Sequence, residues 1–276
     1  MSLEAYFGNK HVIVTGGSSG IGLALAETLV RLGSEVTLVA RREGPLLEAK
    51  AKAEAARPGA RVHVLPLDIS DAEAVQVGLT RHLEAHPAQM LINNAGVAMP
   101  GRFLEMDPAQ YRQQMDINYF GMLHMCQVVV PHLVAQGGGH VCNVGSLLSV
   151  MGIYGYSAYA ATKFAMYGFS ECLRAELKPL NVRVTMLLPP DTDTPQHAME
   201  IAHLPEETKA IAGNVKMLSA QQVADACLKG MEAGRFDVVP GMDGRMTVTA
   251  NRWLPGVARW VCDNAAKKVS GARGEA

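Results

Sequence analysis

An apolar run that breaks directly into a glycine-rich turn constrains the fold of this chain more than any other feature of its sequence. Residues 11–15 (HVIVT) are typical of a buried strand, and residues 16–22 (GGSSGIG) follow at once. From Leu23 to Leu32 the apolar positions recur at helical spacing. Such a turn can be an ordinary tight turn. Between a strand and a helix, however, it predicts a site for a pyrophosphate, because glycines allow close approach and the helix N-terminus favours negative charge.

Strand-like and helix-like runs alternate along the rest of the chain, which predicts a parallel sheet flanked by helices. The predicted strands are 12–15, 36–40, 62–67, 90–92, 140–144, 182–188 and 237–239. The predicted helices that follow the first one are 46–56, 72–84, 109–134, 158–178 and 220–233. Asp107 and Pro108 are typical of an N-cap and a first helical residue, so we assign them a structural role.

Composition limits the class of protein. A chain of 276 residues fits one large α/β domain. A net charge of −1 gives no indication of nucleic-acid binding, and the five cysteines form no C-x-x-C pair, which argues against a disulfide framework or a metal site. The longest apolar stretch, 120–134, is interrupted by polar residues and is shorter than the roughly 20 residues of a membrane span. Without a secretory leader, we expect a soluble cytoplasmic protein.

Tyr159 and Lys163 are the candidate acid-base pair. They lie four residues apart, on one face of the predicted helix 158–178. A free phenol keeps its proton up to about pH 10, so it needs a neighbouring positive charge to work near neutral pH. Lys163 can supply that charge. The same spacing also occurs by chance on helix surfaces, so the pair takes its meaning from the other motifs.

Several motifs together resemble the classical short-chain dehydrogenase/reductase family. They are TGGSSGIG, Asn93-Asn-Ala-Gly96, Asn118, Ser146 and the Tyr159-x-x-x-Lys163 pair, and the match covers about residues 10–245. The resemblance implies a single Rossmann-type domain with a doubly wound, seven-stranded parallel sheet, a bound nicotinamide dinucleotide and reversible carbonyl reduction. We therefore expect a catalytic domain at 1–245, with a substrate lid at 191–218, and a C-terminal extension at 246–276. The resemblance also implies a homodimer or homotetramer that pairs through helices 109–134 and 158–178.

Ketone reduction assigns a role to each candidate catalytic residue. Hydride arrives at the carbon, and the oxygen becomes an alkoxide that must be stabilised and protonated. Tyr159 is the candidate acid, and Ser146 would donate a hydrogen bond to the same oxygen. Lys163 would lower the pKa of Tyr159 and bind the nicotinamide ribose. The resemblance implies that Asn118 holds a water that links Lys163 to solvent.

The cofactor preference depends on the end of the second strand. An acidic residue there would bind the ribose 2′-hydroxyl of NAD, but this strand ends in Arg41-Arg42. An arginine favours the 2′-phosphate of NADP(H), although a solvated basic turn is the alternative. Asp68 resembles the family residue that contacts the adenine, and it could also cap the next helix. The expected cofactor-binding residues are Gly16, Ser18, Ser19, Gly20, Ile21, Arg41, Asp68, Ile69, Asn94, Gly96, Tyr159, Lys163, Thr192 and Thr194.

The substrate class depends on the segment after the sixth strand. The family usually has Pro-Gly where this chain has Pro189-Pro190, which removes one N–H. The runs PPDTDTP, TLVARRE and GMDGRM resemble 3-ketodihydrosphingosine reductases, which implies a lipid-like, long-chain 2-amino ketone. Asp191 or Asp193 would pair with the substrate ammonium. The alternative is that these aspartates cap the following helix.

Other functions remain open at this stage. Reduction of 3-oxoacyl thioesters and oxidoreduction of hydroxysteroids use the same catalytic residues. A regulatory protein that binds NADPH without turnover is a further alternative, although it would not need Ser146, Tyr159, Lys163 and Asn118 together.

The C-terminal extension is amphipathic. Trp253 and Trp260 alternate with Arg252 and Arg259, and Pro255-Gly256 interrupts any continuous helix. Such a segment is typical of weak contact with a membrane surface, or of packing on the domain or on a partner subunit.

Overall fold

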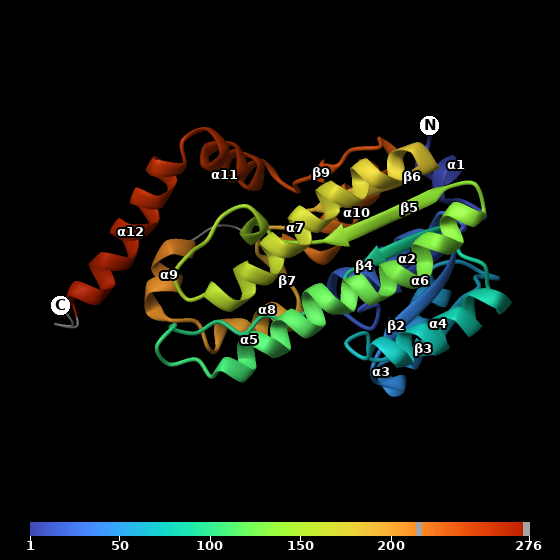
Figure 1. The fold of residues 1–276 in the computed structure, drawn as a ribbon, viewed down its shortest axis with the longest axis horizontal. Coiled ribbons are helices and arrows are strands. Elements are labelled where there is room, and N and C mark those ends of the chain that lie inside the picture. Colours follow the sequence, from blue (N-terminus) through green and yellow to red (C-terminus); the bar gives the residue numbers. More distant parts are fainter. Residues whose placement is uncertain (214–216, 273–276) are drawn as a thin grey trace.

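The computed structural model describes residues 1–213 and 217–272, which form a parallel sheet between two layers of helices (Figure 1). The strand order is β3-β2-β1-β4-β5-β6-β9, and all neighbours are parallel. The strands are β1 (His11–Thr15), β2 (Glu35–Ala40), β3 (Val62–Pro66), β4 (Met90–Asn93), β5 (Gly139–Val144), β6 (Val182–Leu187) and β9 (Asp237–Val238). The predicted doubly wound, seven-stranded sheet is confirmed, with each strand end within one residue of its predicted position.

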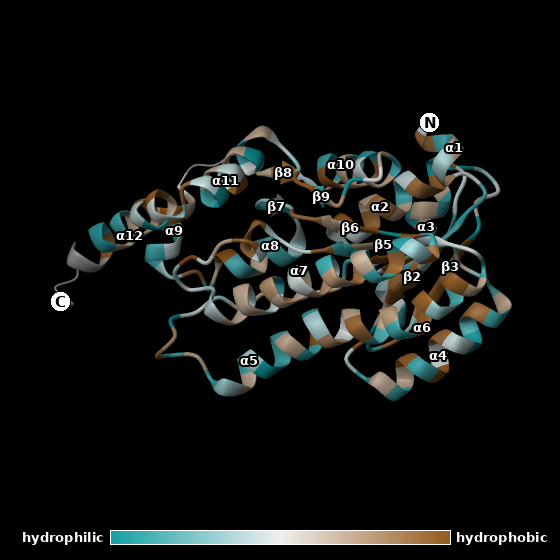
Figure 2. Ribbon diagram, turned by 45° about the horizontal axis from the view of Figure 1, so that its top comes forward, coloured by the Kyte–Doolittle hydropathy of each residue, from teal (hydrophilic) through white to brown (hydrophobic). Residues whose placement is uncertain are grey.

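Helices cover both faces of the sheet, which explains why its strands are apolar on both sides. One face carries α1 (Leu3–Phe7), α2 (Gly20–Arg31), α3 (Glu43–Ala55) and α10 (Ala220–Glu232). The other carries α4 (Ala72–Ala85), α6 (Gly121–Ala135) and α7 (Ser157–Leu177). The strongly apolar segments gather between these layers (Figure 2). Short 3₁₀ turns occur at Leu147–Ser149 and Lys178–Leu180.

The long helix predicted at 109–134 has a defect near its middle. It consists of α5 (Pro108–Met115), a π-helical turn (Asp116–Phe120) and α6. Asp107 caps α5 as predicted, because its carboxylate accepts a hydrogen bond from the N–H of Ala109. π-Helical turns are rare and concentrate at functional sites, and this one holds Asn118.

The segment after β6 forms small elements that the sequence pattern did not predict. They are β7 (Thr192–Asp193), α8 (Pro195–Ile201), α9 (Glu206–Ala212) and β8 (Leu218–Ser219), of which β7 and β8 pair in parallel. These elements occupy the region predicted as a lid at 191–218, of which 214–216 lie outside the described residues.

The C-terminal region forms α11 (Met242–Trp253) and α12 (Pro255–Ala272), separated at Leu254 as Pro255-Gly256 predicted. Helix α12 contacts α9 and extends away from the sheet (Figures 1 and 2). The last part of the predicted extension, 273–276, lies outside the described residues. Within 1–213 and 217–272, no helix combines the length and the apolar character needed to span a bilayer.

The chain reverses its direction of strand addition between β1 and β4, which are neighbours in the sheet. In open parallel sheets of this kind, a crevice forms at the carboxyl ends of the strands at such a switch point, and ligands bind there. The fold therefore directs the search for a site to the residues that follow β1, β4 and β5.

Candidate active site

A cavity of about 560 Å³ opens at the switch point. It brings together most of the predicted site residues, namely Gly16, Ser19, Gly20, Ile21, Asn94, Gly96, Ser146, Tyr159, Lys163, Asp191, Thr192 and Thr194. The predicted residues outside its lining are Ser18, Arg41, Asp68, Ile69, Asn118 and Asp193. The cavity thus has a floor, made by the residues that follow β1, β4 and β5 and by α7, and a roof, made by α8, α9 and residues 240–244.

The glycine turn after β1 is fixed by contacts that only glycine permits. Gly16 has φ +65°, and a Cβ there would lie 2.8 Å from the Nδ2 of Asn94. A Cβ on Gly22 would collide with the backbone oxygen of Gly16. Asn94 holds the turn from β4, because its Nδ2 donates to the carbonyl of Thr15 at 3.0 Å. The turn is therefore held rigidly against the end of β4.

The start of α2 faces the cavity and suits an anion. Ser19 occupies the N-cap position, but its side chain makes no capping hydrogen bond, and Ser19, Gly20 and Ile21 line the cavity. A Cβ on Gly20 would lie 3.1 Å from the Cγ2 of Thr194, so the turn and the segment after β6 meet across the cavity. Uncapped N–H groups and the helix dipole together fit the pyrophosphate of a dinucleotide.

Four predicted cofactor residues, Ser18, Arg41, Asp68 and Ile69, lie beyond the cavity. Arg41 follows β2 and is exposed. The carboxylate of Asp68 accepts hydrogen bonds from the N–H and the hydroxyl of Ser70, at 3.0 and 2.7 Å. The alternative role of Asp68 as a helix cap is wrong, because Asp71 caps α4. Ile69 is buried in the core.

Lys163 is buried beneath the phenol of Tyr159. Its side chain is 4% exposed, and its Nζ donates to the carbonyl of Val144 at 2.9 Å. The same Nζ lies 5.4 Å from the centroid of the Tyr159 ring. Burial lowers the pKa of Lys163 to about 8, against the opposing effect of the Glu200 carboxylate. An ammonium with a depressed pKa is suited to give and take protons near neutral pH.

The pKa of Tyr159 differs from the prediction. Lys163 was expected to lower it, but in the structure the pKa lies above its ordinary value. Removal from water raises it most, the carboxylates of Glu200 and Asp191 add to the effect, and the hydroxyl of Ser146 opposes them. The phenol is therefore held protonated, which is the form that an acid requires.

Ser146 and Asn118 are held in place by hydrogen bonds to the main chain. The hydroxyl of Ser146 accepts from the N–H of Leu148 at 3.1 Å. The amide of Asn118 accepts from the N–H of Val97 at 2.8 Å and donates to the carbonyl of Val97 at 2.9 Å and to Thr162 at 3.0 Å. Asn118 therefore joins the π-helical turn to α7, one residue before Lys163.

Glu200 is a site residue that the sequence did not reveal. It lies on α8, lines the cavity and is half-buried. Its carboxylate accepts from the Nε2 of Gln196 at 2.8 Å and from the hydroxyl of Tyr156 at 3.3 Å. Burial raises the pKa of Glu200, and the hydrogen bond from Gln196 opposes this. The sequence signal was only a Gln and a Glu four residues apart.

The two predicted substrate aspartates separate in the structure. Asp191 lines the cavity, whereas Asp193 is exposed and does not. Neither aspartate caps α8, because the hydroxyl of Thr194 accepts from the N–H of His197 at 3.2 Å. The capping alternative is therefore wrong. Only Asp191 remains as a predicted carboxylate in the cavity.

Comparisons with known proteins agree with this geometry. The family model described as short chain dehydrogenase matches residues 10–204. A protein of Bos taurus named 3-ketodihydrosphingosine reductase is 36% identical over 240 residues, which cover 86% of this chain and 72% of that protein. A short-chain dehydrogenase from Burkholderia cenocepacia J2315 in complex with NADP matches with a TM-score of 0.75 and 28% identity, over 91% of this chain and 96% of the other. A short-chain dehydrogenase/reductase from Burkholderia phymatum in complex with NAD matches with a TM-score of 0.79 and 26% identity, over 89% and 94%.

Proposed function

The chain belongs to the short-chain dehydrogenase family, and we propose that it uses NADPH to reduce 3-ketodihydrosphingosine, a long-chain 2-amino ketone, to the amino alcohol. As a member of this family it is an oxidoreductase that interconverts a carbonyl group and an alcohol. The observation that carries the choice of substrate is Glu200, a half-buried carboxylate on the cavity wall beside the candidate acid.

The floor of the cavity has the groups that carbonyl reduction requires. A nicotinamide dinucleotide held by its pyrophosphate at the glycine turn would supply hydride to the carbonyl carbon. Tyr159 gives its phenolic proton to the resulting alkoxide, and the Ser146 hydroxyl donates a hydrogen bond to the same oxygen. Lys163 stabilises the phenolate that forms and returns the proton to it. Asn118 fixes the helix turn from which a water relay to solvent would run.

NADPH is proposed as the cofactor because the end of β2 is basic. Arg41 is exposed there, where an acidic residue would bind the 2′-hydroxyl of NAD. A guanidinium binds a phosphate dianion through charge-assisted hydrogen bonds. The B. cenocepacia structure contains NADP and the B. phymatum structure contains NAD, so the fold alone does not decide between them.

An ammonium beside the ketone would give Glu200 a partner. A buried carboxylate without a directly paired cation is costly. The hydrogen-bond partners of Glu200 are the uncharged groups of Gln196 and Tyr156, and His197 and Lys163 act on it only through longer-range charge. Asp191 adds a second negative charge to the same region. Neutral 3-oxoacyl thioesters and ketosteroids offer no cation to this acidic wall. The rest of the roof suits an alkyl chain, since Met151, Ile153, Leu204, Ile211, Met217 and Met242 line the cavity.

The test compares two ketones in a Glu200→Gln variant. We expect kcat/KM for 3-ketodihydrosphingosine to fall about 10- to 100-fold, as one charge-assisted hydrogen bond is lost. The same chain-length ketone without its amino group should be reduced at an unchanged rate. Asp193→Asn is the matched control, because Asp193 is on the same segment but outside the cavity, and it should affect neither ketone. Equal loss on both ketones, or no loss on either, would reject the pairing.

Assembly as a homodimer or homotetramer is proposed through the outer surfaces of the α5–α6 helix and α7. Phe120 and Phe164 lie on these elements with exposed fractions of 40% and 46%. Exposed aromatic side chains on neighbouring long helices are typical of subunit interfaces. Light scattering should give the mass of two or four chains, and Phe164→Glu should lower it. A monomeric mass for the unaltered protein would contradict the proposal.

A weak membrane contact is proposed for residues 246–272. Trp253 and Trp260 are 76% and 65% exposed on α11 and α12, with Leu254, Val257 and Val261 exposed beside them. Removal of residues 246–276 should abolish co-sedimentation with anionic liposomes. If full-length and shortened proteins sediment alike, these tryptophans serve instead to pack against a partner subunit.

A further inference from the structure

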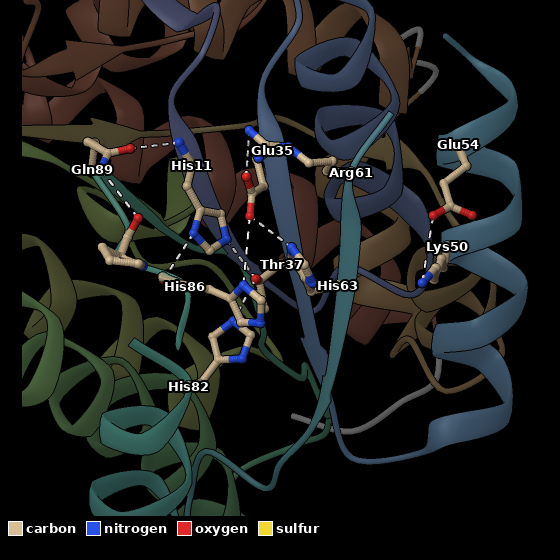
Figure 3. A network of polar contacts seen from close by, with 11 residues as sticks. His11, Glu35, Thr37, Lys50, Glu54, Arg61, His63, His82, His86 and Gln89 are labelled. Atoms are coloured by element: carbon tan, nitrogen blue, oxygen red, sulfur yellow. Dashed lines mark hydrogen bonds and ion pairs between the residues drawn. The ribbon is translucent and has the colours of Figure 1, made fainter. Parts of the chain in front are cut away.

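Four histidines and a glutamate gather at the edge of the sheet where its strands begin, which is opposite to the cavity (Figure 3). They are His11, His63, His82, His86 and Glu35, and none of them lines the cavity. No metal site was expected from the sequence, because its five cysteines form no C-x-x-C pair.

The strand register explains the cluster. His11 on β1 pairs with Glu35 on β2, and Thr37 on β2 pairs with His63 on β3. Residues two apart on a strand point to the same face, so all four side chains share one face of the sheet. Helix α4 lies on this face and contributes His82, and His86 follows one turn later as its C-cap.

Three of these side chains converge on one point. The Oε1 of Glu35 lies 2.8 Å from the Nε2 of His63 and 3.9 Å from the Nδ1 of His86. These ligand atoms all lie within 4.8 Å of one another. Ligands of one zinc ion, each about 2.0–2.2 Å from the metal, can be at most about 4.4 Å apart, so small side-chain rotations would enclose an ion.

We propose that Glu35, His63 and His86 form a binding site for a divalent transition-metal ion. Two imidazoles and one carboxylate are a donor set that suits Zn²⁺, and water would complete a tetrahedral shell. His63 and His86 are 28% and 35% exposed, so an ion can enter from solvent.

The surrounding groups orient these ligands. The Nη2 of Arg61 lies 2.8 Å from the Oε2 of Glu35, which leaves Oε1 as the oxygen for the metal. The carbonyl of His86 accepts from the Nδ1 of His11 at 3.1 Å, which fixes the main chain at His86. The Nε2 of His11 is then free to accept from the hydroxyl of Thr37 at 2.7 Å. Outer contacts of this kind are a regular feature of metal sites.

An ion held by these three ligands would join β2, β3 and the end of α4. Because the native state alone presents the three ligands together, the ion should stabilise the fold.

The experiment titrates the untagged full-length protein with ZnCl₂. Isothermal calorimetry measures binding, and the midpoint of thermal unfolding is measured with and without the ion. We expect one ion per chain and a raised midpoint. His63→Gln, His86→Gln and Glu35→Gln should each weaken binding at least about tenfold. His203→Gln is the matched control, since His203 is an exposed histidine outside the cluster, and it should bind Zn²⁺ like the unaltered protein.

Cobalt distinguishes this site from the exposed thiol of Cys172. Co²⁺ bound by the cluster should show visible absorption of a nitrogen- and oxygen-ligated ion, without the near-ultraviolet band of a thiolate complex. Circular dichroism and NADPH binding should be unchanged in the three variants, which shows that they fold. Zinc binding that survives in these folded variants, an absence of binding to the unaltered protein, or a thiolate band that Cys172→Ser removes would each overturn the proposal.

Discussion

The floor and the roof of the cavity are built differently. Ser146, Tyr159 and Lys163 on the floor follow β5 or lie on the 21-residue helix α7, both of which pack in the core. The roof helices α8 and α9 have seven residues each, and α8 has no buried residue. The difference teaches that the groups proposed for proton transfer are fixed by the scaffold, whereas the groups proposed to select the substrate are carried by short, lightly packed elements.

The largest expected effect is on the floor. Tyr159→Phe removes the proposed acid and should lower kcat about 10²- to 10⁴-fold. Because the floor acts on any carbonyl, the loss should be the same for an amino ketone and a neutral ketone. Steady-state kinetics with both ketones measure it, and NADPH fluorescence checks that binding is retained. A loss confined to the amino ketone would place Tyr159 among the selecting groups instead.

The burial of Lys163 should appear as a dependence of stability on pH. Its pKa is about 8 in the folded protein and 10.5 ordinarily, so between these values the unfolded chain holds the proton and the folded chain does not. Stability therefore rises with pH across this window. The free energy of unfolding should gain up to about 3 kcal/mol relative to Lys163→Met. Urea unfolding of both proteins at pH 7.5 and 10 measures the change, and parallel pH profiles would contradict it.

The cofactor end of the floor is tested at Arg41. Arg41→Glu replaces a partner of the 2′-phosphate by a repelling charge and should raise the KM for NADPH at least about tenfold. The KM for NADH should change little or fall. Arg42→Glu provides the neighbouring control. If the Arg41 and Arg42 variants behave alike, the turn is a solvated basic turn and the preference resides elsewhere.

The smallest expected effect is a pH dependence of substrate preference that arises from Glu200 on the roof. Because burial raises the pKa of Glu200, its carboxylate takes up a proton on mild acidification earlier than an ordinary glutamate. The ratio of kcat/KM for the amino ketone to that for the neutral ketone should therefore fall as the pH is lowered from neutral. In Glu200→Gln the ratio should be independent of pH. A pH-dependent ratio that persists in this variant would assign the titration to another group.

The sequence predicted the floor of the cavity better than its roof. The seven strands and the candidate floor residues were predictable because apolar periodicity and fixed motif spacing are local features. Glu200 was not, since its position against the cavity depends on how α8 packs beside β7 at the cavity wall. The pKa of Tyr159 was predicted in the wrong direction because burial of the phenol, the largest cause of the rise, and the approach of the Glu200 and Asp191 carboxylates arise only in the folded chain.

The amino edge of the sheet gives a second example of the same limit. His11, Glu35 and His63 are far apart in sequence, and only the register of three parallel strands places them together. Spacing rules for metal ligands apply within one element, so they could point to His82 and His86 at the end of α4 but not to the approach of His86 to Glu35 and His63. In the C-terminal extension the sequence was sufficient, since the helix break at Pro255 follows from a local property of proline.

The most direct test of the proposed function is NADPH consumption by the purified protein with four ketones offered side by side. They are 3-ketodihydrosphingosine, its analogue without the amino group, an acetoacetyl thioester and a ketosteroid. The highest kcat/KM is predicted for 3-ketodihydrosphingosine, by about 10- to 100-fold over its neutral analogue. Faster reduction of the thioester or the steroid, or binding of NADPH without turnover of any ketone, would contradict the account.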